Sequence, residues 1–381
     1  MNTLLIHNAT CIATFDHADP AQGRELKNAS LFVRDNMIEW IGSTSELPRA
    51  LLESAGETID ARGHLVMPGL VNTHHHMFQS LTRAIPGAQD AELFGWLRGL
   101  YPIWAGLRPE MVQVSTQVAM AELLLSGCTT SSDHLYIYPN GVRLEDSIEA
   151  AQQIGMRFLA TRGSMSVGQS AGGLPPDSVV EKEDAILKDS QRLIETWHDA
   201  RAGAMVQVAL APCSPFSVSP ALMKQSADMG SATLGICLGS QVFARGLGAD
   251  NHIGTAGEYG WCDVALTDEA RADPVLSHLP ERFAIMQWHS DTFTLPEGTT
   301  HLAHSPKAAA QCFRYGRAGY AMQFHFEANR AVAADWAREF GEAFEANRPG
   351  WVGDFATHAA RDGAAADAHG LAIARAWVGL I

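Results

Sequence analysis

Residues 233–241 (TLGICLGSQ) constrain the fold of this chain more than any other stretch. A short apolar run leads into Cys237, and a helical pattern begins directly after it. This order predicts a strand, a sharp turn and a helix N-terminus, where unpaired N–H groups and the helix dipole favour a thiolate. Glycines at 235 and 239 suit a tight turn. Cys237 is therefore a candidate nucleophile, although a buried cysteine in a glycine-rich turn would show the same pattern.

A second motif, YAMQFHFE at residues 320–327, supplies the partners that such a nucleophile needs. If it forms a strand, positions two apart share one face, so the carboxylate of Glu327 can orient the imidazole of His325. A cysteine, a histidine and a glutamate then make a nucleophile, a base and a group that holds the base. The two motifs together predict nucleophilic catalysis.

The motifs LGICLGSQ and QFHFE resemble those of the class I glutamine amidotransferases, in particular relatives of the amidotransferase domain of GMP synthase. The similarity extends over residues 232–336. The resemblance implies that Cys237 attacks the side-chain amide of glutamine, that His325 transfers the proton and that Glu327 holds His325. It implies no cofactor for this triad.

The same resemblance bears on the groups that bind the substrate. Family members carry a Gly-Gly loop before the cysteine that helps to build the oxyanion hole. Here the nearby pair is Gly172-Gly173, and an ordinary loop is the favoured interpretation of it. The N–H of Leu238 remains as one oxyanion donor, and lacking the other would cost roughly two to four kcal/mol of transition-state stabilisation. Gln241, in the cysteine motif, is expected to contact the substrate.

A different pattern precedes these motifs. Residues 65–76 (LVMPGLVNTHHH) predict an apolar strand that runs into three histidines. His74 and His76 are two apart, so their imidazoles face the same side and could begin a zinc or iron site. A divalent ion needs at least three protein ligands to be held well. Solvated histidines at a polar strand end would give the same pattern.

The segments PGLVNTHHHMFQSLTRA, MAELLLSGCTTSSDH and LAPCSPFSVSP resemble the amidohydrolase superfamily, specifically its aminohydrolases of heterocyclic rings. The similarity covers roughly residues 1–229. It implies that His74 and His76 bind the metal and that Gln79 lies near the substrate. A barrel of this family needs about 250 residues, and residues 74–230 leave room for about four strand-helix units. We therefore expect an incomplete site that binds zinc or iron weakly.

The pattern of elements predicts an α/β fold with three regions. Alternating residues at 3–15, 30–42 and 57–67 predict short antiparallel strands. Helical stretches then alternate with β-rich runs, which is typical of parallel βα units; the helices are expected at 110–126, 143–154 and 180–201 and the strands at 128–133, 156–161 and 204–212. The predicted regions are a β-rich half of a small β-sandwich (1–68), a partial (β/α) barrel (69–229) and part of an open amidotransferase-like sheet (230–381).

Composition limits the partners of the chain. A net charge of −15 argues against nucleic acid or an anionic membrane as the main partner. We expect no signal peptide and no membrane span. The six cysteines show no CxxC pair, which favours a reduced cytoplasm. The open edge of a half barrel predicts self-association unless the C-terminal region covers it.

Three functions are open from sequence, and the first two hydrolyse a carbon–nitrogen bond and release ammonia. The first is glutamine amidotransferase-like (glutaminase) chemistry through a thioester at Cys237. The second is metal-dependent deamination of a purine or triazine ring. The third is a composite scaffold without catalysis. The two family patterns join near residues 229–232, and we expect the two sheets to pack as one α/β body, with the sheet able to continue across the join.

Overall fold

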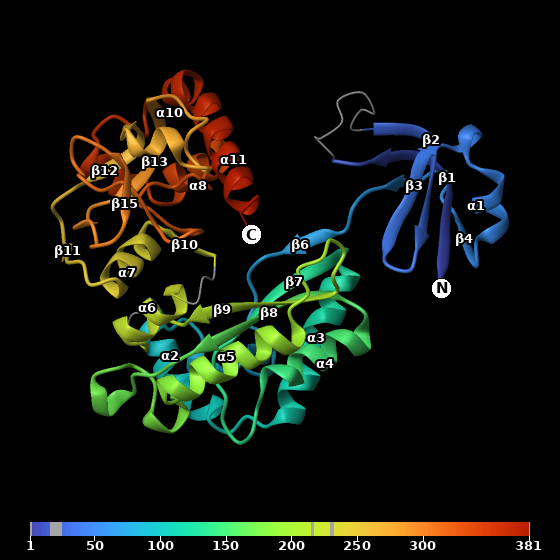
Figure 1. Cartoon of the computed structure of the whole chain (residues 1–381), viewed down its shortest axis with the longest axis horizontal. Helices are drawn as coiled ribbons and strands as arrows, with labels where there is room; N and C mark the ends of the chain where they lie inside the picture. Colours follow the sequence, from blue (N-terminus) through green and yellow to red (C-terminus); the bar gives the residue numbers. More distant parts are fainter. Residues whose placement is uncertain (1, 16–24, 215–216, 229–231, 381) are drawn as a thin grey trace. The chain divides into compact units, whose positions relative to one another are not determined.

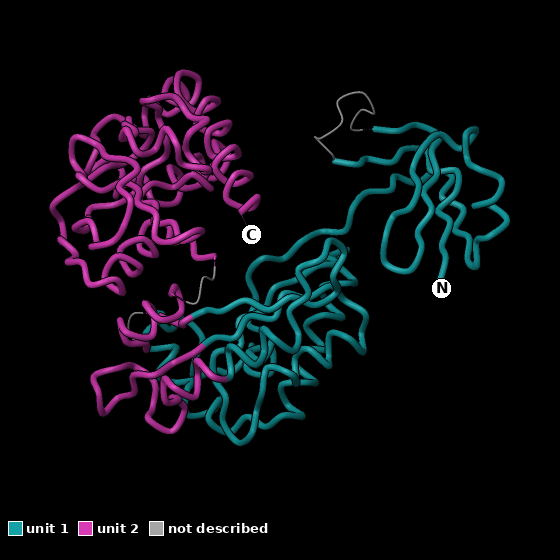
Figure 2. Tube along the Cα trace, viewed as in Figure 1, with its two compact units in different colours: residues 1–163, 189–211 teal, residues 164–188, 212–381 magenta. Residues whose placement is uncertain are grey.

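The computed structural model describes residues 2–15, 25–214, 217–228 and 232–380. The chain divides into two compact units, drawn in teal and magenta in Figure 2. Unit 1 comprises residues 1–163 and 189–211, and unit 2 comprises residues 164–188 and 212–381. Each unit is described by itself. The predicted join at 229–232 falls largely outside the described residues.

The N-terminal segment is a small sheet around a long central strand. Its strands are β1 (Thr3–Ala13), β2 (Glu25–Arg34), β3 (Met37–Ser43), β4 (Glu57–Asp60) and β5 (Leu65–Val66), with helix α1 (Arg49–Ser54) between β3 and β4. Strands β1, β2 and β3 pair antiparallel as predicted, with a turn at Asp35, whose φ is 54°. The antiparallel prediction is wrong for residues 57–67. There β4 and β5 run parallel to β1, because the connection through α1 brings the chain back to the other side of β1 in the same direction.

The next segment is half of a barrel. Its strands are β6 (Leu70–Asn72), β7 (Cys128–Leu135), β8 (Arg157–Ser164) and β9 (Val206–Pro212), and its helices are α2 (Leu93–Trp104), α3 (Pro109–Leu125), α4 (Leu144–Ile154) and α5 (Glu183–Trp197). The strands lie side by side in chain order, and β6, β7 and β8 pair parallel (Figure 1). The predicted alternation of strands and helices is confirmed. Eight strands close a barrel of this kind, so this curled sheet is a half barrel.

The C-terminal region is built on a second, separate sheet. Its strands are β10 (Thr233–Ile236), β11 (Asn251–His252), β12 (Glu258–Leu266), β13 (Arg282–His289), β14 (Thr292–Phe293), β15 (Thr300–His304), β16 (Cys312–Tyr315) and β17 (Gly319–Met322). Its helices are α6 (Pro220–Asp228), α7 (Leu238–Gly246), α8 (Arg330–Glu339), α9 (Gly341–Asn347), α10 (Phe355–His358) and α11 (Ala364–Val378), the last preceded by one π-helical turn.

The main sheet of this region has the strand order β10-β17-β16-β15-β12-β13. Strands β10 and β17 pair parallel, and the other pairs are antiparallel. One apolar cluster packs the sheet against residues of α8, α9 and α11, and a smaller one packs it against Phe243 and Ala244 of α7. The predicted open α/β sheet is therefore present. The expectation that the sheet could continue across the join stays a prediction.

Candidate functional site

The chain turns sharply at Cys237, between β10 and α7. Cys237 has φ 49° and ψ −109°, a conformation that costs a non-glycine residue roughly 1 to 3 kcal/mol. Its backbone N–H donates to the carbonyl of Met322 over 2.8 Å, which ties the turn to the end of β17. At Gly235, a Cβ atom would meet the carbonyl oxygen of Gly239 at 2.5 Å. Strand and helix approach this closely only because residue 235 is glycine.

Strand pairing brings the second motif to the cysteine. Ile236, the last residue of β10, pairs with Met322, the last residue of β17. Because the two strands are parallel, the residues that follow them emerge at the same edge of the sheet. The backbone N–H of His325 donates to the carbonyl of Met286 over 2.8 Å, which fixes the position of the imidazole.

Cys237, His325 and Glu327 are in contact. His325 Nδ1 lies 2.6 Å from Glu327 Oε1, and the imidazole shares a hydrogen bond with the thiol of Cys237. Burial lowers the pKa of His325, but its hydrogen bonds with Cys237 and Glu327 outweigh burial and raise that pKa to about 9. His325 is thus protonated at neutral pH, which places a cation beside the sulfur of Cys237.

The prediction that residues 320–327 form one strand is wrong. Strand β17 ends at Met322, His325 makes an isolated bridge to Met286, and Glu327 lies in the turn that follows. The backbone leaves the strand because the chain must pass to α8. The contact between imidazole and carboxylate therefore comes from a turn, and not from two side chains on one face of a strand.

The predicted substrate-binding groups lie around the cysteine. Leu238 is the first residue of α7, and the helical hydrogen bonds to Cys237 begin at the N–H groups of Ser240 and Gln241. The Leu238 N–H thus precedes the intrahelical bonds, as an oxyanion donor requires. Gln241 is 5% exposed, and its Nε2 donates to Gln323 Oε1 over 3.1 Å. The roles of Leu238 and Gln241 stay predictions.

Gly172-Gly173 forms a loop that closes on itself. The N–H of Gly173 donates to the carbonyl of Gly168, and that of Gly172 donates to Gln169. This agrees with the interpretation of the pair as an ordinary loop.

Two neighbours of the sulfur were not predicted from sequence. The thiol of Cys237 donates to the carbonyl of Trp288 over 3.6 Å, and Gln323 Nε2 donates to the sulfur over 3.7 Å. Gln323 is fully buried. A sequence signal for it existed, since a glutamine stands directly after the apolar strand and two positions before His325.

The histidine-rich segment lines a separate cavity of about 470 Å³. The residues around it are His74, His75, His76, Gln79, Ser80, Thr82, Arg83, Trp96 and Glu122. The rings of His74 and His76 are perpendicular, with centroids 5.1 Å apart. Gln79 Nε2 donates to the hydroxyl of Tyr136 over 2.9 Å. His74 and His76, which were predicted to bind a metal, and Gln79, which was predicted to lie near the substrate, therefore line the same cavity.

Several groups near these histidines are hydrogen-bonded, whereas Asp133 Oδ2 is buried without a hydrogen-bond partner. His76 Nδ1 lies 2.9 Å from the carbonyl of His134, and His134 Nε2 lies 3.2 Å from that of Ala211. Asp133 Oδ1 accepts from the N–H of Met77 over 2.7 Å, and burial raises the pKa of Asp133 to about 7.

The residues present do not fit a divalent metal. Among the described residues, no three histidine, cysteine, aspartate or glutamate side chains gather as a ligand set. His74 and His76 supply two ligands where a well-held ion needs at least three.

Two tryptophans of α2 differ in their relation to this cavity. Trp96 lines the cavity, whereas Trp104 is fully buried and packs edge-on against Phe78. No helix among the described residues is long and apolar enough to cross a membrane.

The sequence model of the Amidohydrolase family matches residues 65–260, just over half of the chain. The chain belongs to the amidohydrolase family. The model of the class-I glutamine amidotransferases matches residues 194–336, so both patterns are present. The two matches overlap across β9, α6, β10 and α7, a strand-helix alternation that both kinds of α/β fold contain.

Several characterised amidohydrolases are similar to this chain. The 8-oxoguanine deaminase of Pseudomonas aeruginosa is 45% identical over 233 residues, which are 61% of this chain and 50% of the relative. The hydroxydechloroatrazine ethylaminohydrolase of Pseudomonas sp. (strain ADP) is 37% identical over 227 residues, 57% of this chain and 47% of the relative. The chain spans about half the length of the curated relatives it matches.

Among solved structures, the atrazine chlorohydrolase of Arthrobacter aurescens TC1, complexed with zinc, superposes with a TM-score of 0.54 at 31% identity. The match covers 61% of this chain and 52% of that enzyme. It agrees with an amidohydrolase-type α/β fold for part of this chain.

Proposed function

We propose that this protein hydrolyses the side-chain amide of glutamine to glutamate and ammonia, with Cys237 as nucleophile. The observation that carries the proposal is the contact of all three triad side chains at the end of two parallel strands, with His325 protonated beside the thiol. The sulfur has a charged imidazole beside it and lies at a helix N-terminus, in a turn at the end of a strand.

The chemistry follows from the positions of the groups. The thiolate of Cys237 attacks the amide carbon, and the oxygen of the tetrahedral intermediate accepts a hydrogen bond from the N–H of Leu238. His325 donates its proton to the leaving nitrogen, which departs as ammonia and leaves a thioester on Cys237. Water then attacks the thioester while His325 takes a proton back, and glutamate leaves. Glu327 holds the imidazole throughout.

Mass spectrometry of the intact protein after incubation with 6-diazo-5-oxo-norleucine tests the proposal, because this glutamine analogue alkylates an amidotransferase cysteine only when the glutamine pocket is formed. We expect one adduct on the parent protein and none on Cys237→Ala. A folded parent protein that gains no adduct and releases no ammonia from glutamine would refute the proposal.

A second candidate is deamination of a heterocyclic ring in the cavity of unit 1. The identity with 8-oxoguanine deaminase and the presence of Trp96, Gln79 and the histidines around one cavity favour binding of a planar heterocycle there. The metal on which this family's hydrolysis depends does not fit the two available histidines, so we derive no catalytic step at this cavity. Equilibrium dialysis with a radiolabelled purine, compared between parent and Trp96→Ala, tests the binding.

A further inference from the structure

The sulfur of Cys237 has a polar neighbour that the triad does not include. Gln323 lies between β17 and His325, is fully buried, and points its carboxamide at the sulfur, with Nε2 at 3.7 Å. The same carboxamide accepts from Gln241 through Oε1. A buried carboxamide in this position either offers the sulfur a donor or turns a carbonyl oxygen toward it, and only the first arrangement favours a thiolate.

Neighbouring groups decide which way the two amides point. The carbonyl of Asp291 can only accept, and it lies 3.5 Å from the Gln241 amide, so the Gln241 atom that faces it must be the NH₂ nitrogen. That nitrogen also faces Gln323, so the Gln323 atom in contact with it must be the oxygen. The NH₂ group of Gln323 is then left to face the sulfur.

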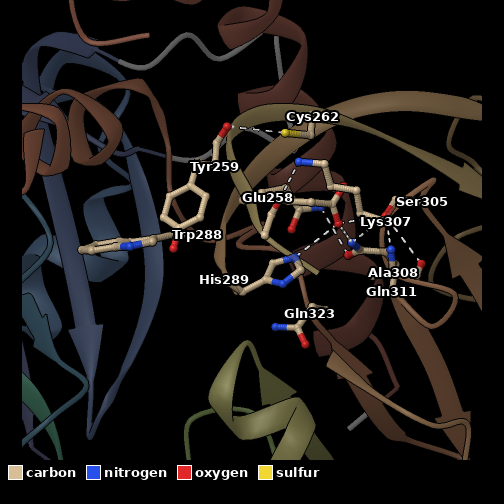
Figure 3. Close-up of polar contacts among 12 residues, drawn as sticks. Glu258, Tyr259, Cys262, Trp288, His289, Ser305, Lys307, Ala308, Gln311 and Gln323 are labelled. Atoms are coloured by element: carbon tan, nitrogen blue, oxygen red, sulfur yellow. Dashed lines mark hydrogen bonds and ion pairs between the residues drawn. The ribbon is translucent and has the colours of Figure 1, made fainter. Parts of the chain in front are cut away.

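The carbonyl of Asp291 is itself contacted by His289, a buried residue beside Glu258. His289 Nδ1 donates to it over 2.9 Å, and His289 Nε2 lies 3.4 Å from Glu258 Oε2. Glu258 Oε2 also accepts from Ser305 over 2.8 Å and from Gln311 over 2.5 Å. Figure 3 shows this network, with His289 pointing at Glu258 and Gln323 below it. The hydrogen bonds of His289 Nδ1, Ser305 and Gln311 restrict the positions of these buried side chains.

We infer that Gln323 is a hydrogen-bond donor to the Cys237 thiolate, and that Gln241 and the Asp291 carbonyl fix the orientation of its amide. The inference rests on the proposed function and adds to it a residue that stabilises the nucleophile. Thiolates accept hydrogen bonds, and a donor aimed at the charged form favours that form. The other titratable groups at the sulfur are His325 and, behind it, Glu327, and both stay in place when Gln323 is changed.

The test is the pH dependence of Cys237 alkylation by iodoacetamide, a small neutral electrophile that does not need the glutamine pocket. Gln323→Met keeps the length of the side chain and removes the donor. We expect it to raise the apparent pKa of alkylation by about one unit and to slow alkylation about tenfold below that pKa. The limiting rate at high pH should not change, because the thiolate is then fully formed in both proteins.

Gln287→Met is the matched control. Gln287 is also fully buried, and its Nε2 donates to Gln311 Oε1 over 3.2 Å and not to the sulfur. The Gln287→Met substitution should lower thermal stability but leave the pH profile of Cys237 alkylation unchanged. If Gln323→Met does not fold, Gln323→Asn withdraws the donor by one methylene and should shift the profile in the same direction.

Superimposable profiles for the parent and the Gln323 variants would overturn the inference, and so would an equal shift in Gln287→Met. The proposed function fails separately. Suppose that Gln323→Met shifts the alkylation profile, but the parent protein neither hydrolyses glutamine nor reacts with 6-diazo-5-oxo-norleucine. Glutamine hydrolysis would then be refuted, and the role of Gln323 as a donor to the sulfur would stand.

Discussion

The cysteine site and the histidine site of this protein each keep part of a family pattern, but only at the cysteine site do the predicted residues hold one another. Cys237, His325 and Glu327 form a connected set of hydrogen bonds. His74 and His76 line a cavity without a third ligand among the described residues.

The difference lies in how each site is distributed over its fold. The triad needs only two short motifs that follow neighbouring parallel strands, β10 and β17, so one strand pairing assembles it. A barrel metal site takes its ligands from strands around the whole circle. With four barrel strands, the described part of this chain forms a cavity lined by histidines but no cluster of three or more metal ligands. The contacts at the cysteine site therefore depend on fewer strands than a metal site built around a ring.

The largest test of this contrast is Cys237→Ala. Glutamine hydrolysis should fall about a thousandfold or more, because no other group can form the thioester. Ammonia release from glutamine, measured with purified protein, reports the loss. Cys262→Ser is the matched control, because burial raises the pKa of the Cys262 thiol to about 11 and keeps it unreactive. Activity that survives in Cys237→Ala would place the chemistry elsewhere.

The second test separates the histidine from its carboxylate. Glu327→Gln should lower the rate about a hundredfold, since His325 loses the group that orients it and sustains its charge. The substitution should also lower the pKa of His325 from its value of about 9. NMR titration of the His325 imidazole in parent and variant measures that change, and an unchanged titration would argue against the ion pair.

The same pair predicts a pH dependence of stability. The pKa of His325 is higher in the folded protein, about 9, than its ordinary value of 6.5. The protonated form is therefore favoured by folding, so its stabilisation is fully present below pH 6.5 and is lost as the pH rises through about 9. Urea unfolding midpoints should fall over this interval in the parent protein and fall less in Glu327→Gln.

A smaller effect is expected at the turn that presents the cysteine. In Gly235→Ala the new Cβ would lie 2.5 Å from the carbonyl of Gly239, so α7 must shift, at a cost of about 1 to 3 kcal/mol. Urea unfolding measures the cost, and alkylation of Cys237 should slow as well. Gly239→Ala is the control, because its Cβ meets nothing within 4 Å and alanine favours a helix by up to about 1 kcal/mol. Equal stabilities of the two variants would contradict the close approach.

Sequence predicted those parts that depend on local order. The strand, turn and helix around Cys237 follow from an apolar run, a cysteine and a helical pattern, and they are present. The alternation of helices and strands in the half barrel was also predictable. The parallel direction of β4 was not, because it depends on the path through α1 and not on alternation within residues 57–60.

The contacts around the sulfur show the same limit. No periodicity places Gln323 beside Cys237 or Glu327 in a turn, because these positions follow from where β17 ends and from the bridge between His325 and Met286. The parts that sequence could not supply are those set by contacts between distant segments. The two sequence motifs identified the three triad residues, but they did not predict the turn that brings Glu327 to His325.

The smallest expected effect concerns metal. Dialysis against a chelator should leave glutamine hydrolysis unchanged, because the triad chemistry uses only the side chains of Cys237, His325 and Glu327. Zinc titration monitored by calorimetry should show weak binding in the parent protein and a further loss in His74→Ala, since two imidazoles hold a divalent ion poorly. Tight, stoichiometric zinc that His74→Ala abolishes would mean that further ligands join the two histidines. The contrast between the two sites would then disappear, and ring deamination would become the better proposal.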